Sequence, residues 1–290
     1  MAKVSNIYQK VYELQMRYCE LAMKNSSLLK IIDEAEISEQ VYNSNAIENS
    51  TLSLEETDKI LLQIDLDRYV TEREIFEAKN LARVVSYIRE KAKNQELNVE
   101  MLLLLHKMLL SNIQDDIAGR FRHEDEWVRV ANHIAEDPLK ISGKIDDMFV
   151  VYKTTLRENI IKRIALFHLT FEHIHPFIDG NGRIGRVLNN YLLIREGFVT
   201  INIKFIDRNL YYDAFKEFNN NGKTKVMEEI VGKAITNSFH KRLAYLERKE
   251  IVLLADYAKS EKLSYPNLLN KAKRQSIEAF LEKGKWKIGK

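Results

Sequence analysis

A glycine-rich segment between two apolar stretches constrains the fold of this chain more than any other feature. The segment reads His-Pro-Phe-Ile-Asp-Gly-Asn-Gly-Arg-Ile-Gly-Arg over residues 175–186. Apolar residues dominate at 160–171 before it and at 187–194 after it, which predicts a buried helix on each side. Because Pro176 disfavours helical angles at the preceding residue, we expect the first helix to end near Ile174. Two core helices joined by a short loop are therefore predicted.

The loop between these helices carries groups that can bind a phosphate. Gly180 and Gly182 allow backbone conformations that other residues avoid, and the second helix is expected to begin near Gly182. The free N–H groups of a first helical turn favour an anion. Arg183 and Arg186 are three residues apart, so they share one face of this helix, where both can form paired hydrogen bonds to phosphate oxygens. The segment therefore predicts an anion site.

Two further side chains add chemistry to this anion site. Asp179 offers a hard oxygen ligand for a Mg²⁺ ion carried by a nucleotide. His175 is the group in the segment that can accept a proton near neutral pH. An anion site, a metal ligand and a base together indicate phosphoryl or nucleotidyl transfer.

The segment 175–186 resembles the signature of Fic-domain proteins, His-(Pro)-Phe-x-(Asp/Glu)-Gly-Asn-Gly-Arg-x-x-Arg, at every defined position. The resemblance extends over roughly residues 1–245 and implies a mainly α-helical bundle with a small β-hairpin, the flap. It also implies protein adenylylation (AMPylation), in which ATP and Mg²⁺ bind the loop and AMP passes to a Ser, Thr or Tyr hydroxyl of a target protein. An ordinary glycine-rich loop is a poor alternative, because two arginines and an aspartate would have no phosphate to bind.

The resemblance assigns a role to most of these residues. His175 would deprotonate the attacking hydroxyl, and Asp179 would hold Mg²⁺ on the α- and β-phosphates. Phe177 would anchor the loop in the core, and Arg183 and Arg186 would hold the β- and γ-phosphates. The residues expected to bind ATP or its phosphates are Gly180, Asn181, Gly182, Arg183, Gly185, Arg186, Tyr212 and Asn219.

Tyr212 and Asn219 belong to this set because residues 207–219 resemble the segment that packs against adenine and ribose in Fic proteins. An alternative stays open, since a tyrosine and an asparagine are also ordinary residues on the polar face of an amphipathic helix.

The segment Ser44-Asn-Ala-Ile-Glu-Asn49 is the second informative stretch. Read alone, Ser44 and Glu48 are a pair four residues apart on a solvated helix face. The segment also resembles the inhibitory pattern (Ser/Thr)-x-x-x-Glu-(Gly/Asn) of class II Fic proteins, which lies N-terminal to the catalytic core. The resemblance implies that Ser44, Glu48 and Asn49 form an inhibitory element. Glu48 would pair with Arg186 and place a negative charge where the triphosphate must lie.

Residues 127–134 form the best hairpin candidate. Trp127-Val-Arg-Val130 alternates and is rich in β-branched residues, and Ala131-Asn132 can form a turn. Together with Gly119-Arg-Phe-Arg122 it resembles the Fic flap, which holds a target segment by strand pairing. The expected flap residues are Val130, Ala131, Asn132 and His133, although the family more often has Gly at position 131.

Polar patterns also predict where several other helices begin. Ser53-Leu-Glu-Glu56 and Thr71-Glu-Arg-Glu74 both match the capping box, and Asn98 can cap an apolar helix over 99–110. The histidines 168, 173 and 175 do not predict a zinc site, because they lack a neighbouring cysteine and ligand-like spacing.

The last forty residues differ from the rest in composition. Residues 250–290 indicate a helix, a turn, a second helix and an alternating strand-like end, and lysines outnumber acids from residue 271 onward. This order resembles the small winged helix-turn-helix of excisionase- and MerR-type proteins. It suggests contacts with DNA phosphates, and it equally fits a docking or dimer module that never touches DNA.

The overall composition is that of an ordinary globular protein, with 45% apolar residues, 30% charged residues and a net charge of +3. Bulk charge therefore indicates neither a nucleic-acid-binding nor a membrane-bound protein. One cysteine excludes an internal disulfide framework. We expect a cytoplasmic location, because no secretory signal and no membrane-length apolar run is visible.

We expect three domains: an N-terminal helical region with the inhibitory helix (1–95), a Fic catalytic core (96–248) and a winged helix-turn-helix-like module (249–290). Two alternatives to an adenylyltransferase stay open. One is a Fic enzyme that removes AMP or transfers another phosphate-bearing group, and the other is a DNA-binding regulator that uses the C-terminal module. Self-modification and a homo-oligomer are further expectations, and the sequence does not identify the target protein.

Overall fold

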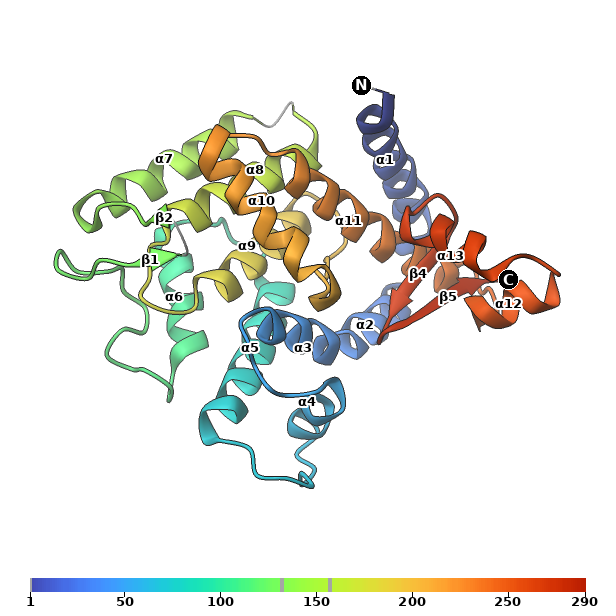
Figure 1. Ribbon diagram of the computed structural model, residues 1–290, viewed down its shortest axis with the longest axis horizontal. Coiled ribbons are helices and arrows are strands. Elements are labelled where there is room, and N and C mark those ends of the chain that lie inside the picture. Colours follow the sequence, from blue (N-terminus) through green and yellow to red (C-terminus); the bar gives the residue numbers. More distant parts are fainter. Residues whose placement is uncertain (1, 131–132, 156–157) are drawn as a thin grey trace. The chain divides into compact units, whose positions relative to one another are not determined.

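The computed structural model describes residues 2–130, 133–155 and 158–290, with side chains from residue 7 onward. These residues fold mainly into α-helices, with two small antiparallel sheets (Figure 1). Their contacts divide the chain into two compact units, each assembled from separate stretches of sequence. The first unit contains Met1–Glu36, Val199–Asn202 and Val231–Lys290, and the second contains Ile37–Phe198 and Ile203–Ile230. The three sequence-based domains stay a prediction.

The second unit contains the segments that carry the predicted site. Its elements are α3 (Ile37–Ile47), α4 (Leu54–Leu61), α5 (Glu72–Lys91), α6 (Val99–Leu110), β1 (Arg129–Val130), β2 (His133–Ile134), η1 (Pro138–Lys140), α7 (Ile141–Thr154), α8 (Ile160–Ile174), α9 (Asn181–Arg195), η2 (Phe205–Asp207) and α10 (Arg208–Asn221).

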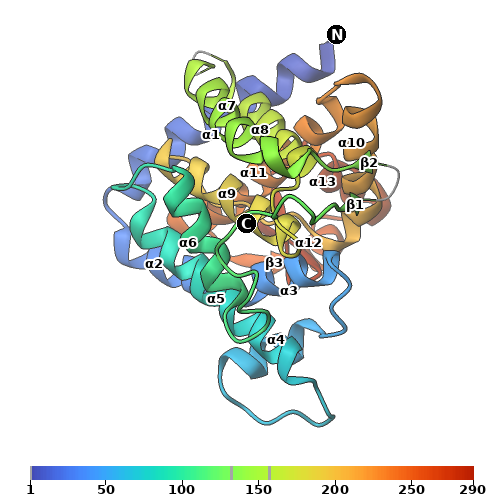
Figure 2. The ribbon, with the colours of Figure 1, turned by 90° about the vertical axis from the view of Figure 1, so that its left-hand side faces the viewer.

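Helix α9 forms the centre of the second unit. Nearly all of its residues are buried, including Asn189 and Asn190, so its sequence lacks a solvated face. It packs against α8, α5, α3 and α6, and Figure 2 shows α5, α6 and α8 around it. The two apolar stretches around the glycine-rich loop are therefore core helices, as predicted.

The predicted caps are confirmed at three helices. Ser53 and Thr71 each accept a hydrogen bond from the backbone of the third helical residue, and the glutamates there bond back to the cap. The Asn98 side chain accepts a hydrogen bond from the backbone N–H of Met101 at the start of α6.

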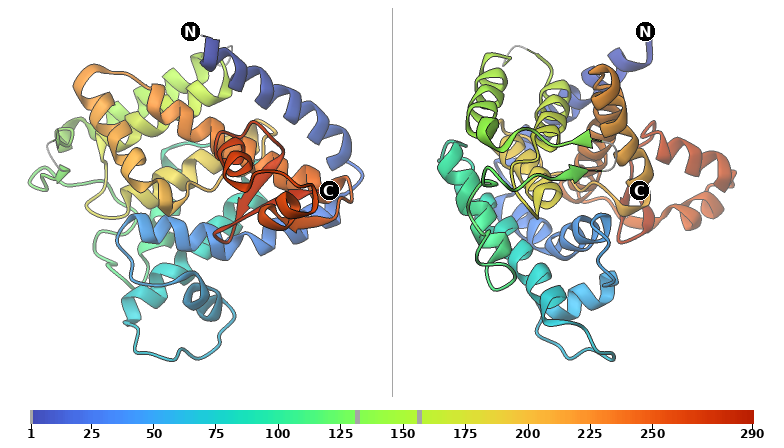
Figure 3. Two further views of the ribbon diagram at one scale, coloured as in Figure 1. Left: turned by 45° about the vertical axis from the view of Figure 1, so that its right-hand side comes forward. Right: turned by 60° about the vertical axis from the view of Figure 1, so that its left-hand side comes forward.

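The predicted hairpin is present as β1 and β2. The strands are antiparallel, with Arg129 opposite Ile134 and Val130 opposite His133. The right-hand view of Figure 3 shows both strands crossing in front of the second unit's helices. Ala131 and Asn132 lie outside the described residues, so their predicted turn stays a prediction.

The first unit contains α1 (Ala2–Ala22), α2 (Ser26–Ala35) and the C-terminal module, while α11 (Lys225–Leu246) begins in the second unit. The module consists of β3 (Ile251–Leu253), α12 (Leu254–Ser260), α13 (Tyr265–Lys273), β4 (Ala279–Glu282) and β5 (Lys285–Gly289), visible in the left-hand view of Figure 3. Its strands are ordered β3-β5-β4, and an apolar cluster that includes Leu254, Leu268 and Ile288 forms its core. From Leu254 onward this order agrees with the sequence pattern, but β3 lies where the first helix was predicted, and the likeness to winged-helix proteins stays a prediction.

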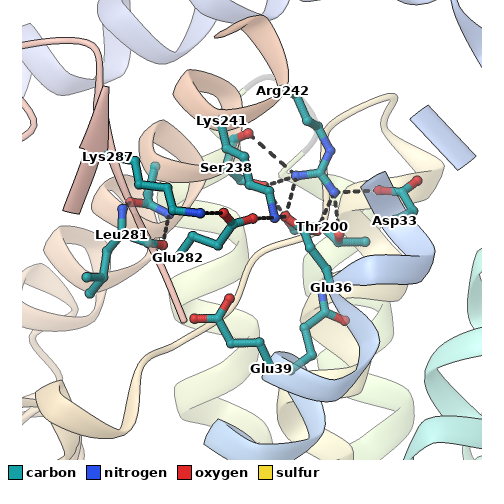
Figure 4. A network of polar contacts seen from close by, with 12 residues as sticks. Asp33, Glu36, Glu39, Thr200, Ser238, Lys241, Arg242, Leu281, Glu282 and Lys287 are labelled. Atoms are coloured by element: carbon teal, nitrogen blue, oxygen red, sulfur yellow. Dashed lines mark hydrogen bonds and ion pairs between the residues drawn. The ribbon is translucent and has the colours of Figure 1, made fainter. Parts of the chain in front are cut away.

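A buried ionic network ties the parts of the first unit together (Figure 4). Arg242, which is 1% exposed, donates hydrogen bonds to Asp33, Glu36, Thr200 and Ser238. Further ion pairs link this cluster to the β4–β5 hairpin. Lys241 pairs with both Glu36 and Glu282, and Glu282 also pairs with Lys287. The network will be called the Arg242 network.

Within the described ranges, no helix is both long and apolar enough to cross a membrane.

Candidate active site

The loop geometry agrees closely with the sequence prediction. Helix α8 ends at Ile174, and His175 follows in a left-handed conformation with φ 51°, its N–H bonded to the Phe171 carbonyl. Gly180, with φ 84°, precedes the first residue of α9, Asn181, one position before the expected Gly182. A side chain at Gly180 would be strained at this φ, so glycine suits the sharp entry into α9.

Asn181 and Phe177 hold the loop in shape. The Asn181 amide both accepts a hydrogen bond from the Phe177 N–H (3.0 Å) and donates one to the Phe177 carbonyl (2.8 Å). Phe177 is fully buried, as the resemblance implied. The Asn181 side chain is thus used to fix the loop, which leaves the N–H groups of the first turn of α9 to bind an anion.

His106 on α6 is a loop-positioning residue that the sequence analysis did not identify. Its Nδ1 accepts a hydrogen bond from the Gly119 N–H and its Nε2 lies 3.0 Å from the Asp179 carbonyl, which makes Nε2 the protonated nitrogen. The ring also stacks on Phe177 at a centroid distance of 3.7 Å. Burial lowers the pKa of His106 to about 4, so the neutral form persists at neutral pH.

His175, the predicted base, is largely enclosed at the end of α8. Burial lowers its pKa to about 4, and the charge of Arg122 contributes to this shift. Arg122 donates a hydrogen bond to the His175 carbonyl, which fixes the backbone of the base. At neutral pH the imidazole is uncharged and can accept a proton.

Asp179 is held by two arginines. Its Oδ2 lies 3.0 Å from Arg73 of α5, and its Oδ1 lies 3.1 Å from Arg183 and accepts a hydrogen bond from the Gly180 N–H. Glu77, also on α5, binds both arginines. Arg183, predicted to hold phosphate, is therefore paired with carboxylates in this arrangement.

The donor set around Asp179 fits a nucleotide-borne Mg²⁺ and not a metal held by protein alone. Within the described part of the chain, no group of three or more His, Cys, Asp and Glu side chains could hold a metal ion. Asp179 is about one-third exposed, so one carboxylate is accessible. Mg²⁺ is commonly held by one or two carboxylates together with substrate phosphates and water, and Asp179 can supply that single ligand once its arginines turn to phosphate.

The segment 44–49 meets Arg186 as the resemblance implied. Arg186, 7% exposed, donates to the Ser44 hydroxyl (2.9 Å), to the Ser44 carbonyl (2.8 Å) and to the Glu48 carboxylate (2.8 Å). Its remaining contact is with the Tyr211 hydroxyl at 3.1 Å. Burial disfavours the charge, yet Tyr211 and Glu48 raise the pKa of Arg186 above its ordinary value.

The Glu48 carboxylate occupies the space next to the first turn of α9. A methyl group added to Gly182 would lie only 2.1 Å from Glu48 Oε1. The carboxylate therefore lies where the helix N-terminus would bind an anion. Asn49 follows with φ 69°, a conformation that favours Gly or Asn, which gives a physical reason for the last position of the inhibitory pattern.

Gly185 lies against α8 and not in the loop. A side chain there would collide with Glu172 at 2.7 Å and with the His168 ring at 2.9 Å. This location gives Gly185 a role in close helix packing, while its predicted contact with phosphate stays untested.

The structure brings the flap and α10 to the end of α8. The His133 ring stacks on His173 at 4.2 Å, and His173 Nδ1 lies 2.8 Å from Asn219 Oδ1. Tyr212 donates its hydroxyl to the Ile47 carbonyl, next to the inhibitory segment. Tyr212, Asn219 and His133 thus surround the same region, and their contacts with ATP stay predictions.

Tyr211 and Glu172 are two further residues that the sequence analysis did not assign to the site. Tyr211 is buried between Arg186 and His168, whose Nε2 lies 2.7 Å from the Tyr211 hydroxyl. Glu172 lies one helical turn before His175, and its spacing of three residues was the available signal.

Comparison with known proteins agrees with this geometry. Residues 96–193 match the family described as "Fic/DOC family". The chain is 29% identical over 188 residues to "Protein adenylyltransferase Fic" of Nematostella vectensis, covering 62% of this chain and 43% of that protein. It is 31% identical over 196 residues to the protein of the same name from Aedes aegypti, covering 65% and 38%. The chain thus spans about two fifths of the length of these relatives.

A crystal structure of a Fic domain containing signaling protein from Bacteroides thetaiotaomicron superposes with a TM-score of 0.72 at 20% identity. The match covers 84% of this chain and 98% of that one, and it establishes a shared fold. The fold, the glycine-rich loop and the family match lead to one conclusion: residues 96–193 of this chain are a Fic/DOC-family domain.

Proposed function

We propose that this protein is an autoinhibited protein adenylyltransferase that transfers AMP from ATP to a Ser, Thr or Tyr hydroxyl of a target protein. The observation that carries the proposal is the contact between Arg186 and the segment 44–49, at the first turn of α9. A carboxylate beside an anion site competes with the anion that binds there, which is expected of an inhibitor if that anion is a triphosphate. The names of the similar proteins in Nematostella and Aedes support the same activity.

The chain's own residues can perform the transfer as follows. His175, neutral at pH 7, accepts the proton of the target hydroxyl as its oxygen attacks the α-phosphorus. The bond from that phosphorus to the oxygen bridging to the β-phosphate breaks, and pyrophosphate leaves. The N–H groups of Asn181 and Gly182 stabilise the charge that develops on the phosphate oxygens, together with that of Gly180 once it leaves Asp179 Oδ1.

The remaining residues bind and orient the nucleotide. Arg183 and Arg186 hold the β- and γ-phosphates once they exchange their carboxylates for phosphate. Asp179 would hold Mg²⁺, which would neutralise phosphate charge when bound. Tyr212 and Asn219 would border the nucleoside, and Val130, Ala131, Asn132 and His133 would hold the target segment by strand pairing.

Glu48 inhibits by occupying Arg186 and by its own charge. While Glu48 holds Arg186, the γ-phosphate lacks its anchor, and the triphosphate binds in a position unsuited to in-line attack. Ser44 helps to hold Arg186, and Asn49 ends the inhibitory segment.

The test compares wild type, Glu48→Gly and Glu48→Gly/His175→Ala, each incubated with ATP and Mg²⁺ and with a cell lysate offered as substrate. We expect AMP addition to the protein itself or to lysate proteins, read by intact mass and by labelled AMP. The addition should be weak in wild type, strong in the single variant and absent in the double variant. An unmodified single variant would contradict the proposal.

Removal of AMP is the alternative reaction of the same site. A hydrolase would use Glu48 to position water, so Glu48→Gly would abolish its activity, whereas it activates a transferase. Release of AMP from modified proteins by wild type alone would therefore favour this alternative.

A second function, DNA binding by residues 250–290, is favoured by the exposed basic residues of the C-terminal module. Lys271, Lys273 and Arg274 near the end of α13 and Lys283 and Lys285 around the hairpin turn are all exposed. We expect salt-dependent binding to duplex DNA that is lost when 250–290 are deleted. Binding that survives the deletion would refute this role.

A homo-oligomer and a cytoplasmic location complete the proposal. The cytoplasmic location is supported by the single cysteine.

A further inference from the structure

Glu172 is a buried acid beside the catalytic base that the transfer described above does not use. Its side chain is 11% exposed, and its Oε2 lies 3.9 Å from His175 Nδ1. Among the described residues, neither Glu172 Oε1 nor His175 Nδ1 has a hydrogen-bond partner of good geometry, although the main-chain carbonyl of Glu172 favours the charged ring of His175. Buried polar atoms are rarely left unpaired, so two of them side by side in one site call for an explanation.

Glu172 and Glu48 are neighbours along one face of α9. Glu48 Oε1 covers Gly182 and Glu172 Oε1 covers Gly185, as the close approaches to added methyl groups show. Positions three residues apart on a helix lie about 5–6 Å from each other. The two carboxyl groups therefore occupy adjacent positions and repel each other if both are charged.

The surroundings of Glu172 favour its protonated form. Burial raises its pKa to about 8, and the charge of Glu48 contributes to this rise, while Arg186 opposes it. The other titratable groups around it are His168 and His175 on the α8 side and Tyr211 on α10. With Glu48 in place, Glu172 is thus mostly a neutral acid at pH 7.

We propose that Glu172 is a positioning residue whose carboxylate supports the charged form of His175 during transfer, and that Glu48 suppresses this support. The inference rests on the proposed adenylyltransferase function. A carboxylate at the far ring nitrogen orients a histidine base and stabilises the imidazolium that forms when it takes a proton. Glu48 would then inhibit twice, by occupying Arg186 and by keeping the support of the base switched off.

When Glu48 leaves, two electrostatic effects on Glu172 change, and both lower the pKa of Glu172. In nucleotide-free protein the repelling carboxylate is then gone and the positive charge of Arg186 is no longer neutralised by it, while burial, the larger cause of the raised pKa of Glu172, stays in place. Both changes favour the ionised form of Glu172. The anion can then accept the Nδ1–H hydrogen bond of His175, which leaves Nε2 as the nitrogen that receives the proton of the target hydroxyl.

The experiment is a double-mutant cycle on the pKa of His175, measured by NMR of histidine ring carbons in nucleotide-free protein. The four proteins are wild type, Glu172→Gln, Glu48→Gly and the double variant. Gln keeps the shape of Glu172 and its main-chain carbonyl, which also interacts favourably with the charged ring of His175. Asp147→Asn removes an exposed carboxylate on α7 and is the matched control.

We expect Glu172→Gln to lower the pKa of His175 by about one unit or more in the Glu48→Gly protein, and by much less when Glu48 is present. In the Glu48→Gly background, transfer should fall roughly 10- to 100-fold in kcat, with the KM for ATP unchanged and the acid limb of the pH profile moved to lower pH. Asp147→Asn should change none of these quantities.

Equal shifts of the pKa in both backgrounds, or no shift in either, would overturn the inference. A kcat that is unchanged by Glu172→Gln would overturn it as well. The NMR cycle needs no transfer, so failure of adenylylation in Glu48→Gly protein would refute the proposed function while the cycle still reports on Glu172.

Discussion

Two buried arginines, Arg242 in the first unit and Arg186 in the second, are both fully hydrogen-bonded, but the residues around them are paired to different degrees. Burial disfavours the charge of both arginines, yet Glu36 and Asp33 keep the pKa of Arg242 above its ordinary value, and Tyr211 and Glu48 do the same for Arg186. In the Arg242 network of the first unit, every buried side-chain polar atom within the described residues has a partner (Figure 4). Around Arg186, the atoms Glu172 Oε1, His175 Nδ1 and His168 Nδ1 have none.

This difference distinguishes the Arg242 network, which has a structural role, from the residues around Arg186, which belong to the proposed active site. Fully bonded ionic networks hold elements in one arrangement, and breaking them exposes buried charge. Unpaired groups are costly and persist where a ligand or a reaction uses them. The three unpaired atoms named here belong to the last two turns of α8 and to His175, next to the first turns of α9, where the proposed chemistry takes place.

The largest expected effect comes from removing each arginine in turn. Arg242→Met leaves Asp33 and Glu36 without their main partner, and we expect a loss of about 3–5 kcal/mol in the free energy of unfolding. Arg186→Met in the Glu48→Gly background leaves no carboxylate of that pair behind. It should therefore change the free energy of unfolding by no more than about 1 kcal/mol, and it should abolish AMP transfer. Urea unfolding followed by circular dichroism measures the losses, and equal losses would remove the distinction between the two clusters.

The second effect concerns acid stability through His106. Its pKa is lowered by burial to about 4 in the folded protein, against about 6.5 when unfolded. Between these values the unfolded chain binds more protons, so stability is complete above pH 6.5 and declines as the pH falls towards 4. The contribution of this group is roughly 3 kcal/mol over that window.

A His106→Gln variant isolates the contribution of this histidine. Gln retains a donor for the Asp179 carbonyl but has no group that titrates in this window. Its stability should therefore depend less steeply on pH between 6.5 and 4 than that of wild type. Parallel curves from thermal unfolding across the window would show that His106 is not the source.

Local signals in the sequence predicted much of this site, and non-local contacts account for what was missed. The ends of α8 and the caps at Ser53 and Thr71 follow from short patterns, whereas the pairing of Glu48 with Arg186 was implied by the family resemblance alone. The roles of His106 and Tyr211 depend on packing between helices distant in sequence. A histidine in an apolar helix reads as core until the partner carbonyl and N–H are located.

The contacts of Arg183 are a second example of what the sequence could not predict. The helix spacing predicted that Arg183 shares a face with Arg186, but it did not predict the present partners of Arg183, which are Glu77 from α5 and Asp179 from the loop. Spacing within one helix determines which residues share a face. It does not determine which side chains of other elements meet that face.

A smaller effect tests whether Glu48 occupies the space beside Gly182. Gly182→Ala removes a helix-destabilising glycine but places a methyl group against Glu48. We expect it to destabilise wild type by about 1 kcal/mol and to stabilise the Glu48→Gly protein by about 0.5–1 kcal/mol. Gly143→Ala on α7 has open space and should stabilise both proteins. The same sign for Gly182→Ala in both backgrounds would contradict the close contact.

The smallest effect lies at the hairpin turn beside the Arg242 network. Lys283 has φ 46° and Gly284 φ 74°, between Glu282 and Lys285, so the turn needs two left-handed residues, for which glycine or asparagine is the favoured choice. Lys283→Gly should therefore raise the stability by up to about 1 kcal/mol, whereas Lys285→Gly within β5 should lower it.

If the lysine at position 283 is retained to contact phosphate, Lys283→Gly should also weaken duplex DNA binding and reduce its salt dependence by about one charge. A stabilised variant with unchanged DNA affinity would leave the lysine without a role in DNA binding, and a destabilised one would show that its side chain contributes more than the strained turn costs.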